Sequence, residues 1–227
     1  MLSLSGMDAP GPGRAARALH LDDVREALRG YAPAPFPAFP GRPAPRDAAV
    51  LVPVVGEARP RVVVTLRPRG MARHAGEICF PGGRPEASDA DLWATAVREA
   101  EEELGLAVVA RLGQLTSLPL FGSDYRMQPF VAHVAEAPWR PHPGEVAAVY
   151  ELDLDEAVRR EVVPGIPYEL HGEERLAPYF DLGDGVVMYG ATALGFWELV
   201  TRVAAHVGAP GPRLARGDRG WKDIMPR

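Results

Sequence analysis

Cysteine is almost absent from this sequence. Of its 227 residues only Cys79 is a cysteine, so the chain cannot form an internal disulfide bond. This excludes the small proteins whose folds depend on several disulfides. Cys79 lies in the apolar run from Ile78 to Phe80, and this run predicts a buried thiol with a packing role.

Long hydrophobic runs are also lacking. No segment approaches the roughly 20 apolar residues that a membrane-spanning helix needs, and no basic region leads into an apolar one near residue 1. The last three residues, Met225, Pro226 and Arg227, match neither a prenylation box nor a retention signal. We therefore expect a soluble, cytoplasmic protein that does not bind membranes.

Lysine is the third scarce residue, because Lys222 is the only lysine among 25 basic residues. Proline is abundant, with 24 residues, and we interpret the excess of Arg, Ala and Pro as a coding bias without functional meaning. Apolar residues make up 47% and charged residues 24% of the chain. These shares are average for soluble globular proteins and argue against a disordered or fibrous chain.

Charge is unevenly distributed along the sequence. Residues 1–75 contain 11 Arg and 6 acidic residues, a net charge of +5, whereas residues 76–227 contain 14 basic and 24 acidic residues, a net charge of −10. A basic segment beside an acidic one favours an anionic small ligand next to a metal-binding patch over duplex DNA. We therefore expect a small-molecule substrate and no nucleic-acid partner.

The chain divides into three expected parts. Apolar spacing predicts a short helix over residues 18–31, and six prolines between residues 32 and 45 predict an extended linker or surface strap. We assign residues 1–46 to this helix and linker, and residues 47–207 to one globular domain. Residues 208–227 are expected to be a disordered or loosely draped tail.

Patterns of both strands and helices occur within the expected domain. The predicted strands are residues 48–55, 61–67, 106–120, 127–134 and 146–152, with a hairpin break at 56–60. The predicted helices are residues 89–104, a short helix from Asp153, and residues 188–206. Strands interleaved with few helices indicate an α/β or α+β sandwich.

The predicted helix over residues 89–104 carries the strongest functional signal. Glu99, Glu102 and Glu103 fall on one arc of this helix, beside the apolar arc that faces the core. Clustered carboxylates repel one another, and hard oxygen ligands on one face suit Mg²⁺ or Mn²⁺. The pattern therefore predicts a divalent metal site on this helix.

An isolated run of glutamates is more often a solvated acidic stripe. The flanking residues favour the metal site here. The Gly82-Gly83 turn lets backbone approach the helix, Arg98 directly precedes the first glutamate, and Gly105 is suited to end the helix.

This segment resembles the motif of the Nudix hydrolases, G-x5-E-x7-R-E-U-x-E-E-x-G-U, in which U is aliphatic. The chain reads Gly83-x5-Asp89-x8-Arg98-Glu99-Ala100-x-Glu102-Glu103-x-Gly105-Leu106. Asp89 replaces the first glutamate and one extra residue precedes Arg98, while the Arg-Glu-x-x-Glu-Glu core is intact. Both departures are similar to those of the coenzyme A pyrophosphatase-like subgroup.

A second signature of that subgroup lies just upstream, roughly L-L-T-x-R-[SA]-x3-R-x3-G-x3-F-P-G-G. The chain reads Val63-Val64-Thr65-Leu66-Arg67-Pro68-x3-Ala72-x3-Gly76-x3-Phe80-Pro81-Gly82-Gly83. Pro68 and Ala72 depart from the signature, and Arg73 supplies a basic group beside the missing arginine. The resemblance covers about residues 46–206.

The resemblance implies an α/β/α sandwich with a mixed sheet. It also implies metal-dependent hydrolysis of coenzyme A (CoA) or its thioesters to adenosine 3′,5′-bisphosphate and (acyl-)4′-phosphopantetheine. The implied ligands of Mg²⁺ or Mn²⁺ are Glu99, Glu102, Glu103 and the carbonyl of Gly82. The implied catalytic residues are Glu102, which orients or deprotonates water, Glu99, and Arg98, which fixes a neighbouring carboxylate. The expected substrate contacts are Arg67, Arg73, Thr65, Gly76 and Phe80.

Two other functions stay open. Pro68 and Ala72 leave room for a Nudix pyrophosphatase that acts on a nucleotide sugar or a dinucleotide. A non-catalytic Nudix-like binding module is the second alternative, and the intact glutamates argue against it. Glu145 is either an extra ligand or base or an ordinary surface residue, and His74 either contacts phosphate or is an ordinary surface histidine. A homodimer also stays open.

Overall fold

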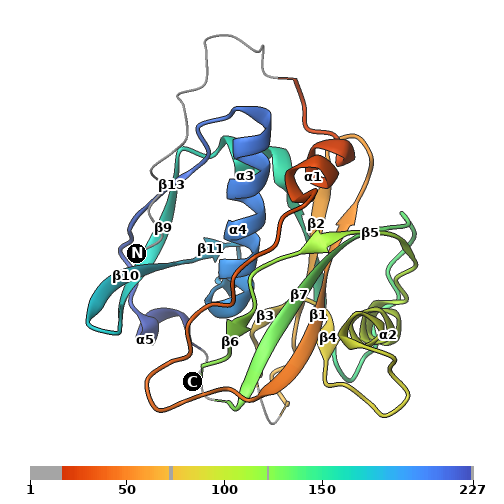
Figure 1. Ribbon diagram of the computed structural model, residues 1–227, viewed down its shortest axis with the longest axis horizontal. Helices are drawn as coiled ribbons and strands as arrows, with labels where there is room; N and C mark the ends of the chain where they lie inside the picture. Colours follow the sequence, from red (N-terminus) through yellow and green to blue (C-terminus); the bar gives the residue numbers. More distant parts are fainter. Residues whose placement is uncertain (1–16, 72–73, 122, 226–227) are drawn as a thin grey trace.

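The computed structural model describes residues 17–71, 74–121 and 123–225 of the chain. A mixed sheet lies at its centre (Figure 1). Its strands are β1 (Arg46–Val55), β2 (Arg61–Leu66), β3 (Ile78–Cys79), β4 (Gly82–Gly83), β5 (Val108–Gln114), β6 (Leu118–Pro119), β7 (Tyr125–Val134) and β8 (Ala148–Asp153). The order is β3-β2-β1-β7-β5, with β8, β4 and β6 paired onto β2, β1 and β7. β1 and β7 run parallel, and the other pairs are antiparallel.

The central strand β1 shows why both faces of the sheet are covered. Every residue from Ala48 to Val55 is buried, as is typical of a strand packed on both sides. Val50 and Val52 belong to one hydrophobic core, whereas Ala49 and Leu51 belong to the other. Since side chains alternate along a strand, these residues face opposite sides of the sheet.

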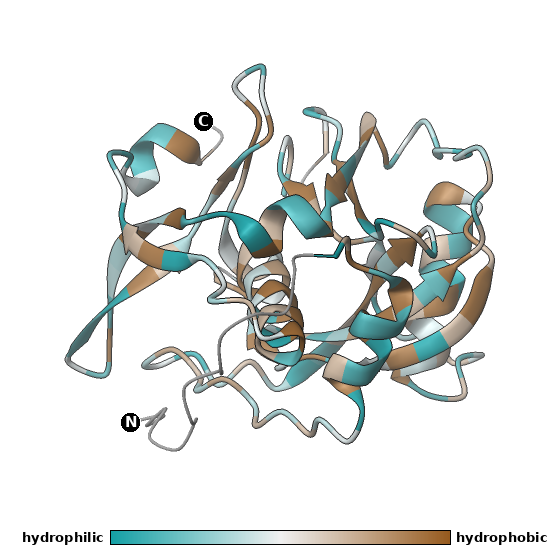
Figure 2. Ribbon diagram, turned by 90° about the horizontal axis from the view of Figure 1, so that it is seen from above, coloured by the Kyte–Doolittle hydropathy of each residue, from teal (hydrophilic) through white to brown (hydrophobic). Residues whose placement is uncertain are grey.

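Helices supply the other half of each core. α2 (Leu92–Leu104) packs on one face, and α1 (Leu21–Leu28), α3 (Leu154–Arg159) and α4 (Gly190–Val207) share the core of the other face (Figure 1). In Figure 2 the hydrophobic residues lie mainly on the strands and on the long helix near the centre of the view. The predicted α/β/α sandwich with a mixed sheet is confirmed.

Most predicted elements differ from the observed ones by a few residues, and two of the differences have a visible cause. The helix expected over residues 89–104 begins at Leu92, because the carboxylate of Asp91 accepts a hydrogen bond from Ala94 N at 2.8 Å and caps it. The strand expected over residues 106–120 is divided into β5 and β6. Between them, Thr116 N donates to Glu198 on α4 at 3.0 Å, so the backbone turns away from the sheet there.

A second, smaller sheet was not predicted. It consists of β10 (Glu173–Pro178), β9 (Val162–Leu170) and β13 (Arg213–Arg216), and it is accompanied by the pair β11 (Phe180–Asp181) and β12 (Val187–Met188). β9 and β10 form an antiparallel hairpin, and β13 runs parallel to β9. This sheet lies on the other side of α4 from β1 and β7 (Figure 1).

Residues 208–225 are part of this second layer. After β13, the hydroxyl of Tyr179 donates to Asp218 at 2.9 Å, and the short helix α5 (Trp221–Ile224) follows. The expectation of a disordered or loosely draped tail is therefore wrong for these residues, while residues 226–227 lie outside the described part. The division of the chain at residues 46 and 207 stays a prediction.

The helices give no sign of a membrane span. Among those within residues 17–71, 74–121 and 123–225, none combines the length and the apolar character that crossing a bilayer requires.

The docking of residues 208–225 predicts the effect of a single methyl group. A Cβ atom at Gly217 would lie 2.6 Å from Tyr179 Oη and 3.0 Å from Pro164 Cβ. Gly217→Ala therefore forces Tyr179 or the segment around residue 217 to shift. We expect the free energy of unfolding to fall by about 1–3 kcal/mol. Urea unfolding measures this change.

Gly70→Ala is the matched control, since no atom of the described part of the chain lies within 4 Å of a Cβ built at Gly70. We expect this variant to differ from the wild type by about 0.5 kcal/mol or less. Equal stability of the two variants would contradict the docking of residues 208–225.

Candidate active site

The Gly82-Gly83 turn is wedged between the sheet and α2. β4 pairs with β1 through Val50 and Gly82 and through Ala49 and Gly83. A Cβ atom at Gly82 would lie 2.6 Å from Val50 Cα, and one at Gly83 would overlap the carboxylate of Glu99. Glycine is therefore required at position 82, where the backbone of β1 leaves no room for a Cβ atom, whereas a Cβ atom at position 83 would displace the carboxylate of Glu99.

Arg98 is the centre of an ion-pair network on α2. Its Nε donates to Asp89 at 3.0 Å, its Nη1 donates to Glu102 at 3.1 Å, and its Nη2 lies 3.1 Å from Glu99. The hydrogen bond with Asp89 raises the pKa of Arg98 above its usual range. Arg98 therefore holds two of the predicted metal ligands in defined positions.

Asp89 ties the segment before α2 to the same network. Its carboxylate accepts hydrogen bonds from Glu86 N and from Thr95 Oγ1, both at 2.9 Å, besides those from Arg98. The hydrogen bond from Arg98 is the largest cause that lowers the pKa of Asp89 below its usual range. Asp89 is thus ionised and structural, because all its visible partners are donors within this segment.

Glu103 is the most buried member of the acidic set, with 3% of its surface exposed. Its carboxylate accepts one long hydrogen bond, from Gly82 N at 3.4 Å. Burial raises the pKa of Glu103 to about 7; the Gly82 N–H and the Arg67 charge oppose this shift, and the charges of Glu145 and Glu99 add to it. The ionised form of Glu103 therefore lacks sufficient counter-charge among the residues that the structure describes.

Glu99 and Glu145 belong to the same electrostatic cluster. Burial raises the pKa of Glu99, the charge of Arg98 opposes the shift, and the charges of Glu102 and Glu145 increase it. Glu145 lies in the turn that precedes β8, far along the chain from α2. The fold thus brings this residue, whose role the sequence left open, toward the acidic face of α2.

These carboxylates do not form a closed ligand set. Among the residues that the structure describes, no three His, Cys, Asp or Glu side chains are gathered closely enough to hold a metal ion by themselves. Arg98 holds Glu99 and Glu102, while Glu103 faces Gly82. The chemistry of the donors nonetheless fits Mg²⁺ or Mn²⁺, because buried carboxylates with raised pKa values are hard oxygen ligands in need of positive charge.

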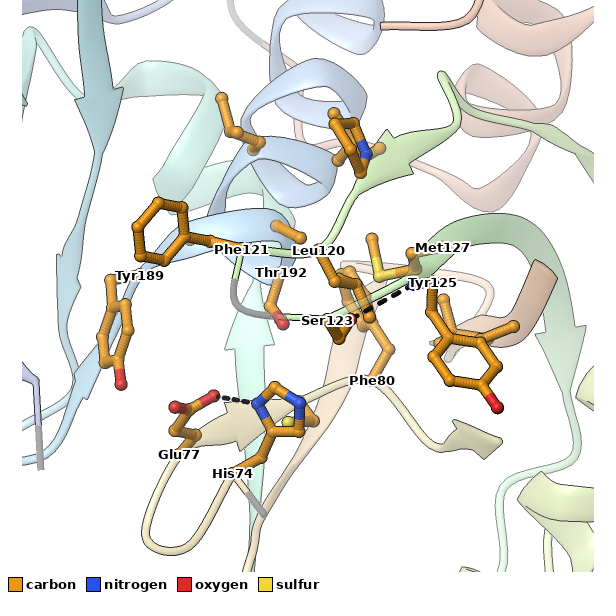
Figure 3. A pocket seen from close by; sticks show the side chains of 18 of the residues that line it. His74, Glu77, Phe80, Leu120, Phe121, Ser123, Tyr125, Met127, Tyr189 and Thr192 are labelled. Atoms are coloured by element: carbon orange, nitrogen blue, oxygen red, sulfur yellow. Dashed lines mark hydrogen bonds and ion pairs between the residues drawn. The ribbon is translucent and has the colours of Figure 1, made fainter. Parts of the chain in front are cut away.

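A cavity of about 680 Å³ opens beside the Gly82-Gly83 turn (Figure 3). This volume is within the usual range of small-molecule sites. Its walls come from the glycine turn, the N-terminal end of α4, residues 118–121, the strap before β1, and the second sheet with α5. Cys79, which was expected to be buried, is half-buried and lines the cavity.

The polar side of the cavity contains groups with unused hydrogen-bonding capacity. The Nε of Arg67 is buried and has no hydrogen-bond partner among the described residues, and the same is true of the hydroxyl of Tyr189. His74 Nδ1 lies 2.9 Å from a carboxylate oxygen of Glu77 (Figure 3). Burial, and secondly the charge of Glu77, raise the pKa of Tyr189 above its usual range.

The predicted substrate contacts are only partly brought together. Arg67 and Phe80 line the cavity. Thr65 is 1% exposed and donates to the carbonyl of Cys79 at 3.3 Å, so its hydroxyl is used within the sheet, and its contact with substrate stays a prediction. Gly76 has φ 71° and shapes the turn after Arg67 without lining the cavity. Arg73 lies outside the described residues.

Glu77, Phe36 and Phe39 line the cavity but were not predicted. No motif marks these residues. The two phenylalanines come from the proline-rich strap, and only the path of the strap across the folded domain places them there.

The family assignment follows from a sequence match that covers the site. Residues 45–166, more than half of the chain, match the family model of the NUDIX domain. The chain belongs to the Nudix hydrolase family. The matched segment includes β1, the glycine turn, α2 and Glu145.

Relatives of known sequence agree with this assignment. The chain is 40% identical over 116 residues to proteins named "Uncharacterized Nudix hydrolase NudL" from Yersinia pestis (strain Pestoides F) and from Yersinia pseudotuberculosis serotype O:1b (strain IP 31758). The match covers 50% of this chain and 58% of each relative. The chain therefore spans little more than half the length of the curated relatives that it matches.

Solved structures of Nudix proteins are more distant. The MutT NUDIX hydrolase from Burkholderia pseudomallei is 23% identical with a TM-score of 0.40, over 48% of this chain and 84% of that one. The MutT protein from Methanosarcina mazei Go1 is 18% identical with a TM-score of 0.40, over 51% of this chain and 82% of that one.

The burial of Glu103 predicts a pH-dependent stability of the metal-free protein. Its pKa is about 7 in the folded state against an ordinary value of 4.5, so the folded state binds more protons between these values. The free energy of unfolding should therefore fall as the pH rises from about 4.5 to about 7, by up to about 3 kcal/mol. Urea unfolding in the presence of a chelator, at pH 5 to 8, measures this slope.

Two variants test whether Glu103 causes the slope. Glu103→Gln should flatten it, whereas Glu101→Gln, which changes an exposed residue of the same helix, should retain it. Added Mg²⁺ or Mn²⁺ should restore stability at pH 8 by mass action. An unchanged slope in Glu103→Gln would contradict the assignment.

Proposed function

We propose that the protein is a Nudix pyrophosphohydrolase that hydrolyses CoA or its thioesters to adenosine 3′,5′-bisphosphate and (acyl-)4′-phosphopantetheine. One structural observation carries this proposal. A cavity of small-molecule size is lined by the Gly82-Gly83 turn and by Arg67, whose buried Nε has no hydrogen-bond partner among the residues that the structure describes. A CoA molecule bound there would place its pyrophosphate at the glycine turn, which adjoins the acidic face of α2, and its 3′-phosphate at the guanidinium group of Arg67.

The acidic face of α2 is the proposed metal site. Nudix enzymes typically require a divalent cation, and the carboxylates of Glu99, Glu102 and Glu103 with the carbonyl of Gly82 would hold Mg²⁺ or Mn²⁺. A divalent cation neutralises the charge of a pyrophosphate and lowers the pKa of a bound water. The chain itself supplies the positions of these ligands, since Arg98 holds Glu99 and Glu102 through its ion pairs.

Glu102 is the proposed residue that orients or deprotonates the attacking water. Its side chain is 59% exposed, so water reaches its carboxylate, while one oxygen remains 3.1 Å from Arg98. This arrangement leaves the other oxygen available to accept a proton. Arg98 acts as a positioning residue, because its guanidinium is engaged in ion pairs with Asp89, Glu99 and Glu102.

Arg67 is the proposed ligand of the 3′-phosphate on the polar side of the cavity. A buried guanidinium N–H without an acceptor is unfavourable, and a phosphate oxygen would satisfy it with a charge-assisted hydrogen bond. The upstream signature that ends in Gly83 supports CoA as the source of that phosphate. Pro68 and Ala72 depart from this signature and favour, as the second candidate, another nucleoside diphosphate derivative such as a nucleotide sugar or a dinucleotide.

Removal of a proposed metal ligand should abolish activity without loss of the fold. We expect Glu99→Gln and Glu103→Gln to lower kcat by at least about a hundredfold at saturating Mg²⁺. Stability should be unchanged or slightly higher, because one of several repelling carboxylates is lost. Glu101→Gln is the control. Near wild-type turnover in either ligand variant would refute the metal assignment.

The 3′-phosphate of CoA provides a test of the substrate. One charge-assisted hydrogen bond is worth about 1.5–3 kcal/mol, so CoA should exceed dephospho-CoA in kcat/KM by about tenfold or more. Arg67→Ala should bring this ratio close to one, mainly through KM, whereas Arg69→Ala, at an exposed position away from the cavity lining, should retain it.

These outcomes test the identity of the substrate independently of the reaction class. An unchanged ratio in Arg67→Ala would contradict its assignment to the 3′-phosphate. Equal rates for CoA and dephospho-CoA in the wild type, or faster cleavage of ADP-ribose than of CoA, would overturn CoA as the substrate and leave a Nudix pyrophosphohydrolase standing.

A further inference from the structure

Three aromatic residues close one side of the cavity, and we call them the aromatic wall: Phe36, Phe39 and Phe121. Phe36 and Phe39 precede residue 45, where the family match begins, so this wall is partly an addition to the common domain. The rings of Phe39 and Phe121 meet edge to face, with 5.8 Å between centroids and 89° between planes. The guanidinium of Arg42 lies 5.2 Å from the ring centroid of Phe121.

The strap that carries Phe36 and Phe39 is fixed by hydrogen bonds on both of its sides. Phe36 N donates to the carbonyl of Ser117 at 2.9 Å, and Arg126 Nη1 donates to the carbonyl of Phe36 at 2.9 Å. Further along, His171 Nε2 lies 3.2 Å from the carbonyl of Ala38. The prolines of the strap also restrict its backbone. The wall is therefore held in place before any ligand binds.

The wall continues into other apolar residues of the cavity. Leu118, Leu120 and Met127 line the cavity, and in Figure 3 Leu120, Phe121 and Met127 lie apart from His74 and Glu77. The side chain of Phe121 is 70% exposed, although it is large and apolar. The cavity thus has a polar side near Arg67 and His74 and an apolar side that is incompletely covered.

We propose that the aromatic wall determines substrate specificity by binding the apolar acyl chain at the end of the pantetheine arm, so that acyl-CoA thioesters are preferred to free CoA. This inference rests on the proposed function. A CoA thioester extends from its pyrophosphate in two directions: the adenosine 3′-phosphate is anionic and suits Arg67, whereas the acyl chain is apolar and suits the wall. Free CoA ends in a thiol and leaves the wall uncovered.

The size of the preference follows from the hydrophobic effect. Burial of one methylene group improves binding by about fourfold. The gain should stop when the chain reaches solvent beyond Phe121. We expect octanoyl-CoA to exceed CoA in kcat/KM by at least about tenfold, with most of the gain in KM, because the acyl chain is remote from the reacting phosphorus.

Kinetics with CoA, acetyl-CoA, butanoyl-CoA and octanoyl-CoA test this inference. In Phe39→Ala and Phe121→Ala, the ratio of kcat/KM for octanoyl-CoA to that for CoA should fall toward one, and Phe39→Leu should retain part of it. Phe121→Ala changes an exposed side chain and is expected to fold normally. Val109→Ala on β5, which also removes an exposed apolar side chain, is the control and should keep the wild-type ratio.

Each outcome is decisive for one of the two proposals. Equal kcat/KM for CoA and octanoyl-CoA in the wild type, or an unchanged ratio in both alanine variants, would overturn the role of the wall while CoA hydrolysis stands. Cleavage of ADP-ribose without cleavage of any CoA compound would overturn the proposed substrate, and the role of the wall with it.

Discussion

The close approach of the Gly82-Gly83 turn to α2 is the constraint on which the rest of the site depends. The turn is paired with β1 on one side and touches the carboxylate of Glu99 on the other. No side chain larger than hydrogen fits at position 82 against the backbone of β1, and one at position 83 would displace the carboxylate of Glu99. The same contact buries Glu103, and this burial gives the carboxylate its raised pKa and its need for positive charge. Backbone packing and metal affinity are therefore two results of one steric arrangement.

Much of the central domain could be predicted from local patterns. The β1 and β2 hairpin, α2 and α4 were all expected, because each sequence shows the apolar pattern that is typical of its strand or helix. The acidic face of α2 was also predicted, since its spacing is a local property of one helix. The hairpin of β9 and β10 was missed, however, because it carries prolines, a glycine and charged residues within its strands.

The rest of the site depends on distant parts of the chain. Thr65 was expected to contact substrate because it belongs to a motif. The motif does not reveal that its hydroxyl donates a hydrogen bond to the carbonyl of Cys79 inside the sheet. Conversely, Phe36 and Glu77 belong to no recognised pattern and reach the cavity only through tertiary packing. Spacing along one helix can be read from sequence, whereas the neighbours of a side chain across the fold cannot.

Segments close to opposite ends of the described chain share the cavity. Phe36 and Phe39 enter it from before β1, and Trp221 and Met225 enter it from beyond β13. A ligand that fills the cavity would therefore couple the order of these two segments, although about 180 residues of sequence separate them. By thermodynamic linkage, any change that loosens one segment lowers the affinity for the ligand. Conversely, the bound ligand protects both segments from proteolysis. The sensitivity of the strap and of residues 213–225 to a protease would thus report on occupancy of a site to which neither contributes a catalytic group.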